Sequence, residues 1–153
     1  MRDPSQVELL PGAVDALRSL AAEGWVLVVI SNQSGVGRGL IGVAEMDAVQ
    51  DRFLAAMHDA RVPIAGSYLC THHPDENCAC RKPSTLFLQE AARAFELDLA
   101  QSWMIGDRES DVLCGKNAGC RTMWLENAEF PVVPGLADFV ARDWAAARAI
   151  ISL

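Results

Sequence analysis

Short apolar runs alternate with segments of helical periodicity along most of this chain of 153 residues. The runs rich in apolar and β-branched residues cover residues 25–31, 64–70, 102–105 and 121–125, and helices are expected over residues 12–23, 43–60, 84–95, 111–117 and 136–150. The run at 25–31 is continuous rather than alternating, as expected for a strand buried on both faces. This alternation predicts an α/β fold: a three-layer, Rossmann-like parallel sheet with helices on both faces.

The chain length suits a single domain spanning residues 1–153. In open parallel sheets of this kind, ligands bind at the carboxyl ends of the strands. The loops after Ile30, Leu69 and Ile105 are therefore expected to meet at one edge of the sheet, and these loops carry most of the polar residues discussed below.

The amino-acid composition and net charge limit the kinds of molecule that this protein is expected to bind. Hydrophobic residues make up 51% of the chain and charged residues 22%, which is typical of a globular protein. The net charge of −7 argues against a general nucleic-acid binder, although a few local cations are enough to hold one small phosphorylated ligand. No apolar run reaches the ~18 residues of a membrane span, and no secretory signal is visible at the N-terminus. We therefore expect a cytoplasmic protein with no membrane contact.

A polar, glycine-rich sequence, Ser-Asn-Gln-Ser-Gly, follows the first predicted strand at residues 31–35. Hydroxyl, amide and backbone N–H groups at the end of a strand can hold phosphate oxygens, so Ser31, Asn32, Gln33 and Ser34 are candidate phosphate ligands. Arg38 could add a bidentate cation. The alternative is an ordinary turn, since Asn, Gly and Ser are common in turns.

Three of the five cysteines lie close together with a histidine: Cys70, His72, Cys78 and Cys80. Thiolate and imidazole groups in one short polar loop predict a tetrahedral Cys3His zinc site. Four protein ligands leave no open position, so this zinc would be structural, folding a loop without a core of its own. His73 is interpreted as a non-ligand. The alternative is a chance cluster of reduced thiols.

Two further motifs carry charge. Arg81 and Lys82 directly follow the last predicted zinc ligand, where a rigid loop would hold both cations in place; the alternative is a solvated basic pair. After the strand at 102–105, Asp107 is a candidate Mg²⁺ ligand, because magnesium typically pairs a few carboxylates with substrate phosphate. Asp111, four residues later, would orient its neighbours or cap the helix that follows.

In this order, the three motifs (Ser-Asn-Gln-Ser-Gly, the Cys/His cluster joined to Arg-Lys-Pro, and Gly-Asp-Arg-x-x-Asp) resemble the haloacid-dehalogenase (HAD) phosphatases. The zinc loop joined to Arg-Lys-Pro is more specific and is similar to the subfamily of D-glycero-D-manno-heptose 1,7-bisphosphate phosphatases and histidinol phosphatases. The similarity covers about residues 7–125.

The resemblance implies a Mg²⁺-dependent phosphomonoesterase that forms an aspartyl-phosphate and acts on a phosphorylated sugar. It implies that Ser31 holds the transferring phosphoryl group with help from residues 32–34, and that Lys82 neutralises its charge. It further implies that Arg81 recognises the substrate, that Asp107 binds Mg²⁺ and that Arg108 lies close to the substrate.

One element of the family pattern is absent. The family begins with a strand ending in Asp-x-Asp-Gly-Thr, which carries the nucleophile and the general acid/base, whereas this chain contains no Asp-x-Asp sequence. Asp3 is not a candidate for the nucleophile, because it lies only a few residues before the Glu-Leu-Leu-Pro-Gly segment at 8–12. In the family, a much longer stretch of chain separates the nucleophile from that segment. We therefore expect a HAD-like sheet without its first central strand, with the nucleophile encoded upstream of Met1.

Three alternatives remain open from the sequence. The chain could be a catalytically inactive, zinc-stabilised relative that binds a phosphorylated sugar or a partner protein. It could be a histidinol-phosphate phosphatase, although the sequence at residues 31–39 is more similar to the heptose branch. A purely structural zinc module would explain the Cys/His cluster but neither Ser31 nor Asp107. The sequence predicts no oligomeric state.

Overall fold

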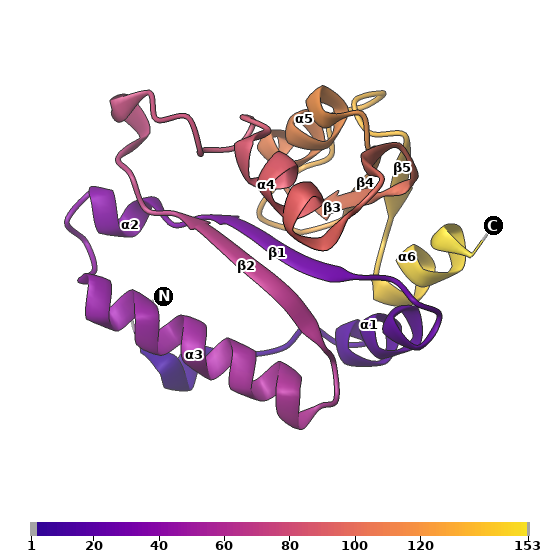
Figure 1. Cartoon of the computed structure of the whole chain (residues 1–153), viewed down its shortest axis with the longest axis horizontal. Helices are drawn as coiled ribbons and strands as arrows, with labels where there is room; N and C mark the ends of the chain where they lie inside the picture. Colours follow the sequence, from indigo (N-terminus) through magenta and orange to yellow (C-terminus); the bar gives the residue numbers. More distant parts are fainter. Residues whose placement is uncertain (1–2, 153) are drawn as a thin grey trace. The chain divides into compact units, whose positions relative to one another are not determined.

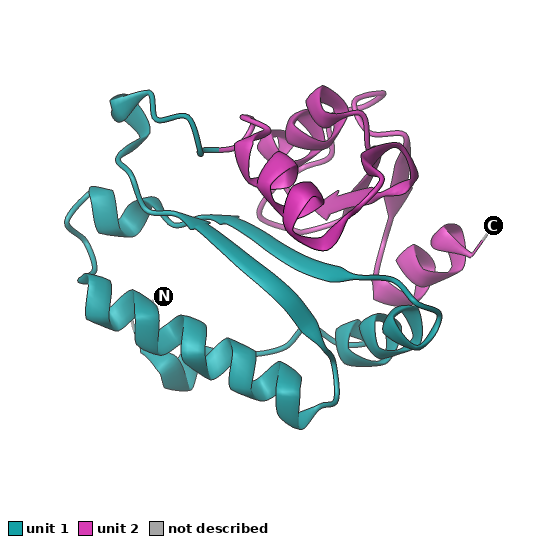
Figure 2. Ribbon diagram, in the orientation of Figure 1, with its two compact units in different colours: residues 1–81 teal, residues 82–153 magenta. Residues whose placement is uncertain are grey.

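The computed structural model describes residues 3–152 and divides the chain into two compact units, residues 1–81 and 82–153 (Figure 2). Each unit pairs parallel strands with helices (Figure 1). The elements of the first unit are η1 (Pro4–Gln6), α1 (Ala13–Ala22), β1 (Leu27–Asn32), α2 (Ser34–Gly37), α3 (Val43–Asp59), β2 (Ile64–Cys70) and η2 (Pro74–Glu76). Those of the second unit are α4 (Leu86–Phe95), η3 (Leu99–Gln101), β3 (Trp103–Gly106), α5 (Glu109–Ala118), β4 (Arg121–Leu125), β5 (Phe139–Ala141) and α6 (Trp144–Ile151).

In the first unit, β1 and β2 form a two-stranded parallel sheet in which Asn32 lies opposite Cys70. The two carboxyl ends therefore lie side by side, and the Ser31 loop and the cysteine loop leave the sheet at neighbouring positions. Helix α3 packs along β2 and buries Met46 and Met57. Its periodic apolar face is the reason that this segment forms a long helix.

In the second unit, β3, β4 and β5 form a parallel sheet in that order. Helix α5 packs on β3 and β4, and α6 packs on β5 and β4. The core of this sheet is centred on Met123, Leu125, Ala141 and Ala147. The parallel α/β architecture is confirmed, although among the described residues the strands form two sheets instead of a continuous one.

The predicted helix over residues 136–150 is wrong in its first half. Residues 139–141 form β5, which pairs with β4, and α6 begins only at Trp144. Asp143 sets this start, because its carboxylate accepts a hydrogen bond from the Ala146 N–H at 2.7 Å and caps the helix. Two smaller corrections concern helices. Thr85, rather than Ser84, is the N-cap of α4, and the predicted loop at 32–42 contains the short helix α2.

Within the described part of the chain, no helix has the length and apolar character needed to cross a membrane.

A buried polar contact holds β4 to the chain that precedes β5. Thr122 is fully buried, and both its backbone N–H and its hydroxyl donate to Asp138 Oδ2 at 2.7 Å. These hydrogen bonds, followed by the positive charge of Lys116, lower the pKa of Asp138. Because the folded state favours the ionised carboxylate, this contact stabilises the fold above the pKa of the unfolded chain, about 3.9.

We therefore expect the free energy of unfolding to fall as the pH drops below about 4 and Asp138 becomes protonated. The Asp138→Asn variant should show a weaker pH dependence in that range, measured by urea unfolding between pH 7 and pH 3. The control is Asp47→Asn on the exposed surface of α3, which should keep the dependence of the original chain. Identical curves for Asp138→Asn and the original chain would contradict the assignment.

Candidate active site and metal centre

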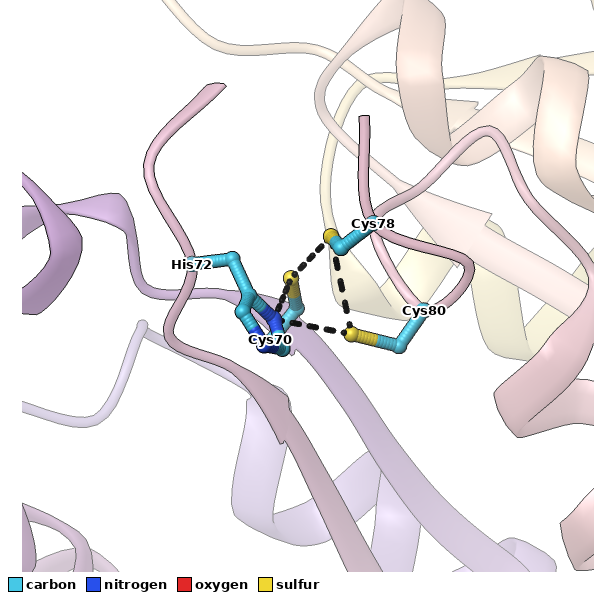
Figure 3. Close-up of side chains that lie close together, drawn as sticks. All are labelled: Cys70, His72, Cys78 and Cys80. Atoms are coloured by element: carbon cyan, nitrogen blue, oxygen red, sulfur yellow. Dashed lines mark hydrogen bonds between the residues drawn. The ribbon is translucent and has the colours of Figure 1, made fainter. Parts of the chain in front are cut away.

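The four predicted zinc ligands come together at the end of β2. Figure 3 shows the side chains of Cys70, His72, Cys78 and Cys80 pointing toward one another, and all four ligand atoms lie within 4.8 Å of each other. Cys70 Sγ lies 3.7 Å from His72 Nδ1 and 3.5 Å from Cys78 Sγ. Cys80 Sγ lies 3.3 Å from His72 Nδ1 and 3.7 Å from Cys78 Sγ.

These separations fit a tetrahedral ion. Sulfur and nitrogen ligands bound to zinc at their usual distances lie about 3.3–3.8 Å apart at the corners of the tetrahedron. Burial and the neighbouring thiols Cys70 and Cys78 raise the pKa of the Cys80 thiol to about 12, because a thiolate there would lie close to other sulfurs with little water around it. A divalent cation bound among the four groups offsets that repulsion, so this cluster has the chemistry and the geometry of a metal site.

His73 has a different role, in agreement with its interpretation as a non-ligand. Its Nδ1 accepts a hydrogen bond from the Asp75 N–H at 3.2 Å, and its own N–H donates to Glu76 Oε1 at 2.7 Å. His73 thus caps the short helix η2 inside the cysteine loop.

The predicted phosphate loop begins at the end of β1. Gln33 is held at both ends: its backbone N–H donates to the Cys70 carbonyl at 2.7 Å, and its side-chain Nε2 donates to Ser31 Oγ at 2.9 Å. Asn32 is the last residue of β1, and Ser34 is the first residue of α2. These four residues follow one another at the carboxyl end of β1, and their role as phosphate ligands stays a prediction.

The two arginines of the first unit that are candidate substrate ligands differ in their surroundings. Arg38 is exposed and follows the last residue of α2. Arg81 is half-buried, and its Nη1 is buried with no hydrogen-bond partner among the described residues. A buried guanidinium nitrogen without a partner is costly, which makes Arg81 suited to bind an anion.

Lys82 makes the tightest ion pair at the site. Its Nζ lies 2.6 Å from Asp111 Oδ1, and the two side chains are only 10% and 7% exposed. Asp111 Oδ2 accepts the Arg108 N–H at 3.1 Å, so Asp111 both orients Lys82 and caps helix α5, the two roles expected for it. The close packing also explains Gly106, because a Cβ added there would overlap the Asp111 side chain.

Asp107 and Arg108 lie at the carboxyl end of β3 and contact one loop, residues 126–133, which follows β4. Asn127 Nδ2 donates to Asp107 Oδ2 at 2.7 Å, while Asn127 Oδ1 accepts the Glu129 N–H at 2.8 Å. The guanidinium carbon of Arg108 lies 3.9 Å from the centre of the Phe130 ring, a cation–π contact. Arg108 and Phe130 also line a cavity of about 440 Å³.

Asn127 and Phe130 were not predicted from the sequence, although a signal was available. Strands β3 and β4 are parallel neighbours, with Gly106 opposite Trp124. The loop after β4 must therefore leave the sheet at the same edge as Asp107. Strand order was the missing information: without it, the loop at 126–133 looks like an ordinary surface connection.

Comparison with known proteins defines the class. A family model described as HAD-hydrolase-like matches residues 79–131. The structure is similar to a HAD-like phosphatase from Mesorhizobium loti, described as putative, with a TM-score of 0.85 and 30% identity, covering 99% of this chain and 76% of the other. It is also similar to the D,D-heptose 1,7-bisphosphate phosphatase of Bordetella bronchiseptica in complex with magnesium and phosphate, with a TM-score of 0.84, 30% identity and coverage of 99% and 87%.

Sequence relatives make the assignment narrower. The D-glycero-β-D-manno-heptose-1,7-bisphosphate 7-phosphatase of Bordetella bronchiseptica is 34% identical over 125 residues, which is 82% of this chain and 69% of the relative. The enzyme of the same name from Escherichia coli K12 is 33% identical over 144 residues, 90% of this chain and 74% of the relative. The chain belongs to the HAD phosphatase family that includes these heptose-bisphosphate 7-phosphatases.

Proposed function

We propose that this protein is a Mg²⁺-dependent phosphomonoesterase that removes the 7-phosphate of D-glycero-D-manno-heptose 1,7-bisphosphate. The observation that carries the proposal is the Cys/His cluster together with the lysine that follows it. The last ligand of the cluster is Cys80, and two residues later the ammonium group of Lys82 is held by a buried carboxylate. The names of the two sequence relatives support the choice of substrate.

The residues of this chain would act mainly by positioning and by charge, which is the usual means of catalysing phosphoryl transfer. Ser31, its hydroxyl oriented by Gln33, would bind the transferring phosphoryl group with help from the backbone and side chains of Asn32 and Ser34. Lys82 would neutralise the charge of that group. Arg38, Arg81 and Arg108 would bind the rest of the anionic substrate.

Two metals fit the residues present. Magnesium, held in part by Asp107, would supply positive charge against the phosphoryl oxygens, and the magnesium complex of the Bordetella enzyme supports this cofactor. Zinc fits the Cys3His cluster, where four protein ligands would make it structural. Elemental analysis of the purified protein should find about one zinc per chain, and replacement of Cys78 by serine should reduce that content.

The deciding experiment measures phosphate release from the heptose bisphosphate and from histidinol phosphate at equal concentrations with Mg²⁺. The protein is assayed as the present chain and, where the coding sequence continues in frame upstream of Met1, with that segment added. Preferred release from the heptose bisphosphate supports the proposal, whereas preferred release from histidinol phosphate would contradict the substrate assignment. Turnover that does not respond to Asp107→Asn would contradict the proposed role of Asp107.

The absence of an Asp-x-Asp sequence favours one second candidate, a non-catalytic relative that binds a phosphorylated sugar. Calorimetric binding of the heptose bisphosphate without phosphate release by either form of the protein would support this candidate over the phosphatase.

Asn127 gives a further prediction about the magnesium ligand. Because Asn127 holds one oxygen of Asp107, the Asn127→Leu variant should need about 10-fold more Mg²⁺ for half-maximal phosphate release, the scale typical of groups that orient metal ligands. Asp107→Asn is the reference variant and should raise the requirement further. An unchanged Mg²⁺ requirement in Asn127→Leu, alongside a raised one in Asp107→Asn, would contradict the role of Asn127 alone.

A further inference from the structure

The cysteine loop and the phosphate loop are joined by backbone contacts within the first unit. We define the metal-site loop as residues 71–80 and the phosphate loop as residues 31–39. They follow neighbouring parallel strands, with Asn32 opposite Cys70 at the end of the ladder. The Gln33 N–H donates to the Cys70 carbonyl at 2.7 Å, so the first residue beyond β1 remains attached to the strand that carries the first metal ligand.

This attachment leads directly to the predicted phosphate ligand. Cys70 contributes its sulfur to the metal cluster and its carbonyl oxygen to Gln33. The side chain of Gln33 then donates to Ser31 Oγ at 2.9 Å. Two consecutive hydrogen bonds therefore connect the backbone of a metal ligand to the hydroxyl of Ser31.

A second contact lies at Gly37, the last residue of α2. A Cβ built on Gly37 would overlap the backbone nitrogen of His73 and the carbonyl carbon of His72, so α2 rests directly on the backbone of the metal-site loop. Glycine is the residue that allows an approach this close. Because the overlapped atoms belong to the backbone, no side-chain rotation can make room for a methyl group.

Few interactions within the metal-site loop itself hold the backbone of His72 and His73 in place. Residues 75–77 and 79 are exposed, and the hydrogen bonds that His73 makes with Asp75 and Glu76 join residues no more than three positions apart. Binding of one ion by Cys70, His72, Cys78 and Cys80 would close the loop across its base and fix the backbone at His72. A loop of this kind takes its order from the metal.

We propose that zinc in the Cys/His cluster supports the phosphate loop, through the Cys70 carbonyl and through contact with Gly37, which is a positioning residue. The metal thus contributes to the orientation of Ser31 while remaining outside the chemistry. This inference rests on the proposed zinc site and on the proposed role of the phosphate loop, and the experiment below separates their failures.

The test is hydrogen–deuterium exchange of the full chain, compared in the zinc-loaded form, after removal of zinc with a chelator, and as zinc-loaded Gly37→Ala. Zinc content is measured in every sample. We expect amides of the phosphate loop to exchange on the order of tenfold faster after chelation and in Gly37→Ala. The control variant is Gly42→Ala, because a Cβ there meets only the end of the Glu45 side chain at 3.5 Å, and it should exchange like the original zinc-loaded chain.

Each outcome decides one part of the inference. Faster exchange confined to the metal-site loop after chelation would overturn the coupling and leave the zinc site intact. A chain that takes up no zinc would overturn the metal site and the coupling together. If Gly37→Ala does not fold, the chelation arm on the original chain still gives the answer. Coupled exchange in a protein that fails to bind inorganic phosphate with Mg²⁺ would support the coupling and overturn the proposed role of Ser31.

Discussion

Replacing Lys82 by methionine should lower the free energy of unfolding by about 3–5 kcal/mol, measured by urea denaturation at pH 7. The ammonium group of Lys82 lies 2.6 Å from the Asp111 carboxylate, and both side chains are almost fully buried. Methionine has a similar length and fills the space, so little packing is lost. What remains is a buried carboxylate without its cation, and that uncompensated charge is the source of the loss.

Two companion variants make this result specific. Lys116→Met removes a lysine of the same unit that forms an exposed ion pair. Lys116 Nζ lies 3.5 Å from Asp138 Oδ1, and the two side chains are 39% and 42% exposed. This variant should lower the free energy of unfolding by less than about 1 kcal/mol. In the double variant Lys82→Met with Asp111→Asn, the neutral amide should recover most of the lost stability, because no charge is left buried. Equal losses in the two lysine variants would show that burial of the pair does not matter.

Replacing Gly106 by alanine should be comparably damaging, with a loss of about 3 kcal/mol or more. The added methyl group would occupy the position of the Asp111 side chain, which Gly106 packs against directly. Asp111 cannot move away without breaking two contacts, its ion pair with Lys82 and its cap on the Arg108 N–H. The damage therefore combines steric overlap with the loss of a buried polar arrangement.

A double-mutant cycle can assign this loss to one contact. The second change is Asp111→Gly, since alanine would retain the Cβ that overlaps. In the Asp111→Gly background, Gly106→Ala should cost far less than in the original chain, and the difference measures the coupling between the two positions. Additive losses would contradict the steric explanation, and circular dichroism of each variant would show whether α5 still forms.

Much of the fold could be predicted from local patterns. The bounds of β2 and β4 and the start of α3 agree with the sequence prediction, because each combines a clear periodicity with a clear boundary residue. The Cys/His cluster was also predictable, since its four ligands lie within one short loop and need no knowledge of the tertiary fold. In both cases the deciding information is local.

The failures share the opposite cause. Strand β5 has only three residues, and it forms because Phe139, Val140 and Ala141 pair with β4. Nothing within those residues outweighs the alanine-rich sequence that follows, so a single long helix was the natural prediction. The contact between Asn127 and Asp107 spans twenty residues and depends on strand order in the same way.

The expectation of one domain and of a single edge where all the loops meet stays a prediction. Within each unit, the structure defines the partners of the candidate site residues. In the first unit Gln33 donates a hydrogen bond to Ser31, and in the second unit Asp111 forms an ion pair with Lys82.

The loop at residues 126–133 has a consequence for how such a protein can diverge. Asn127 contacts the carboxylate of Asp107, and Phe130, three residues later, stacks on the guanidinium group of Arg108. One insertion or deletion between these two positions would change the spacing between the partner of Asp107, the proposed Mg²⁺ ligand, and the partner of Arg108, which is proposed to bind the substrate. The length of the loop at residues 126–133 is therefore under tighter constraint than the exposure of the loop suggests. Exchange of the whole loop between homologues is a better route to a new substrate preference than point substitution within it.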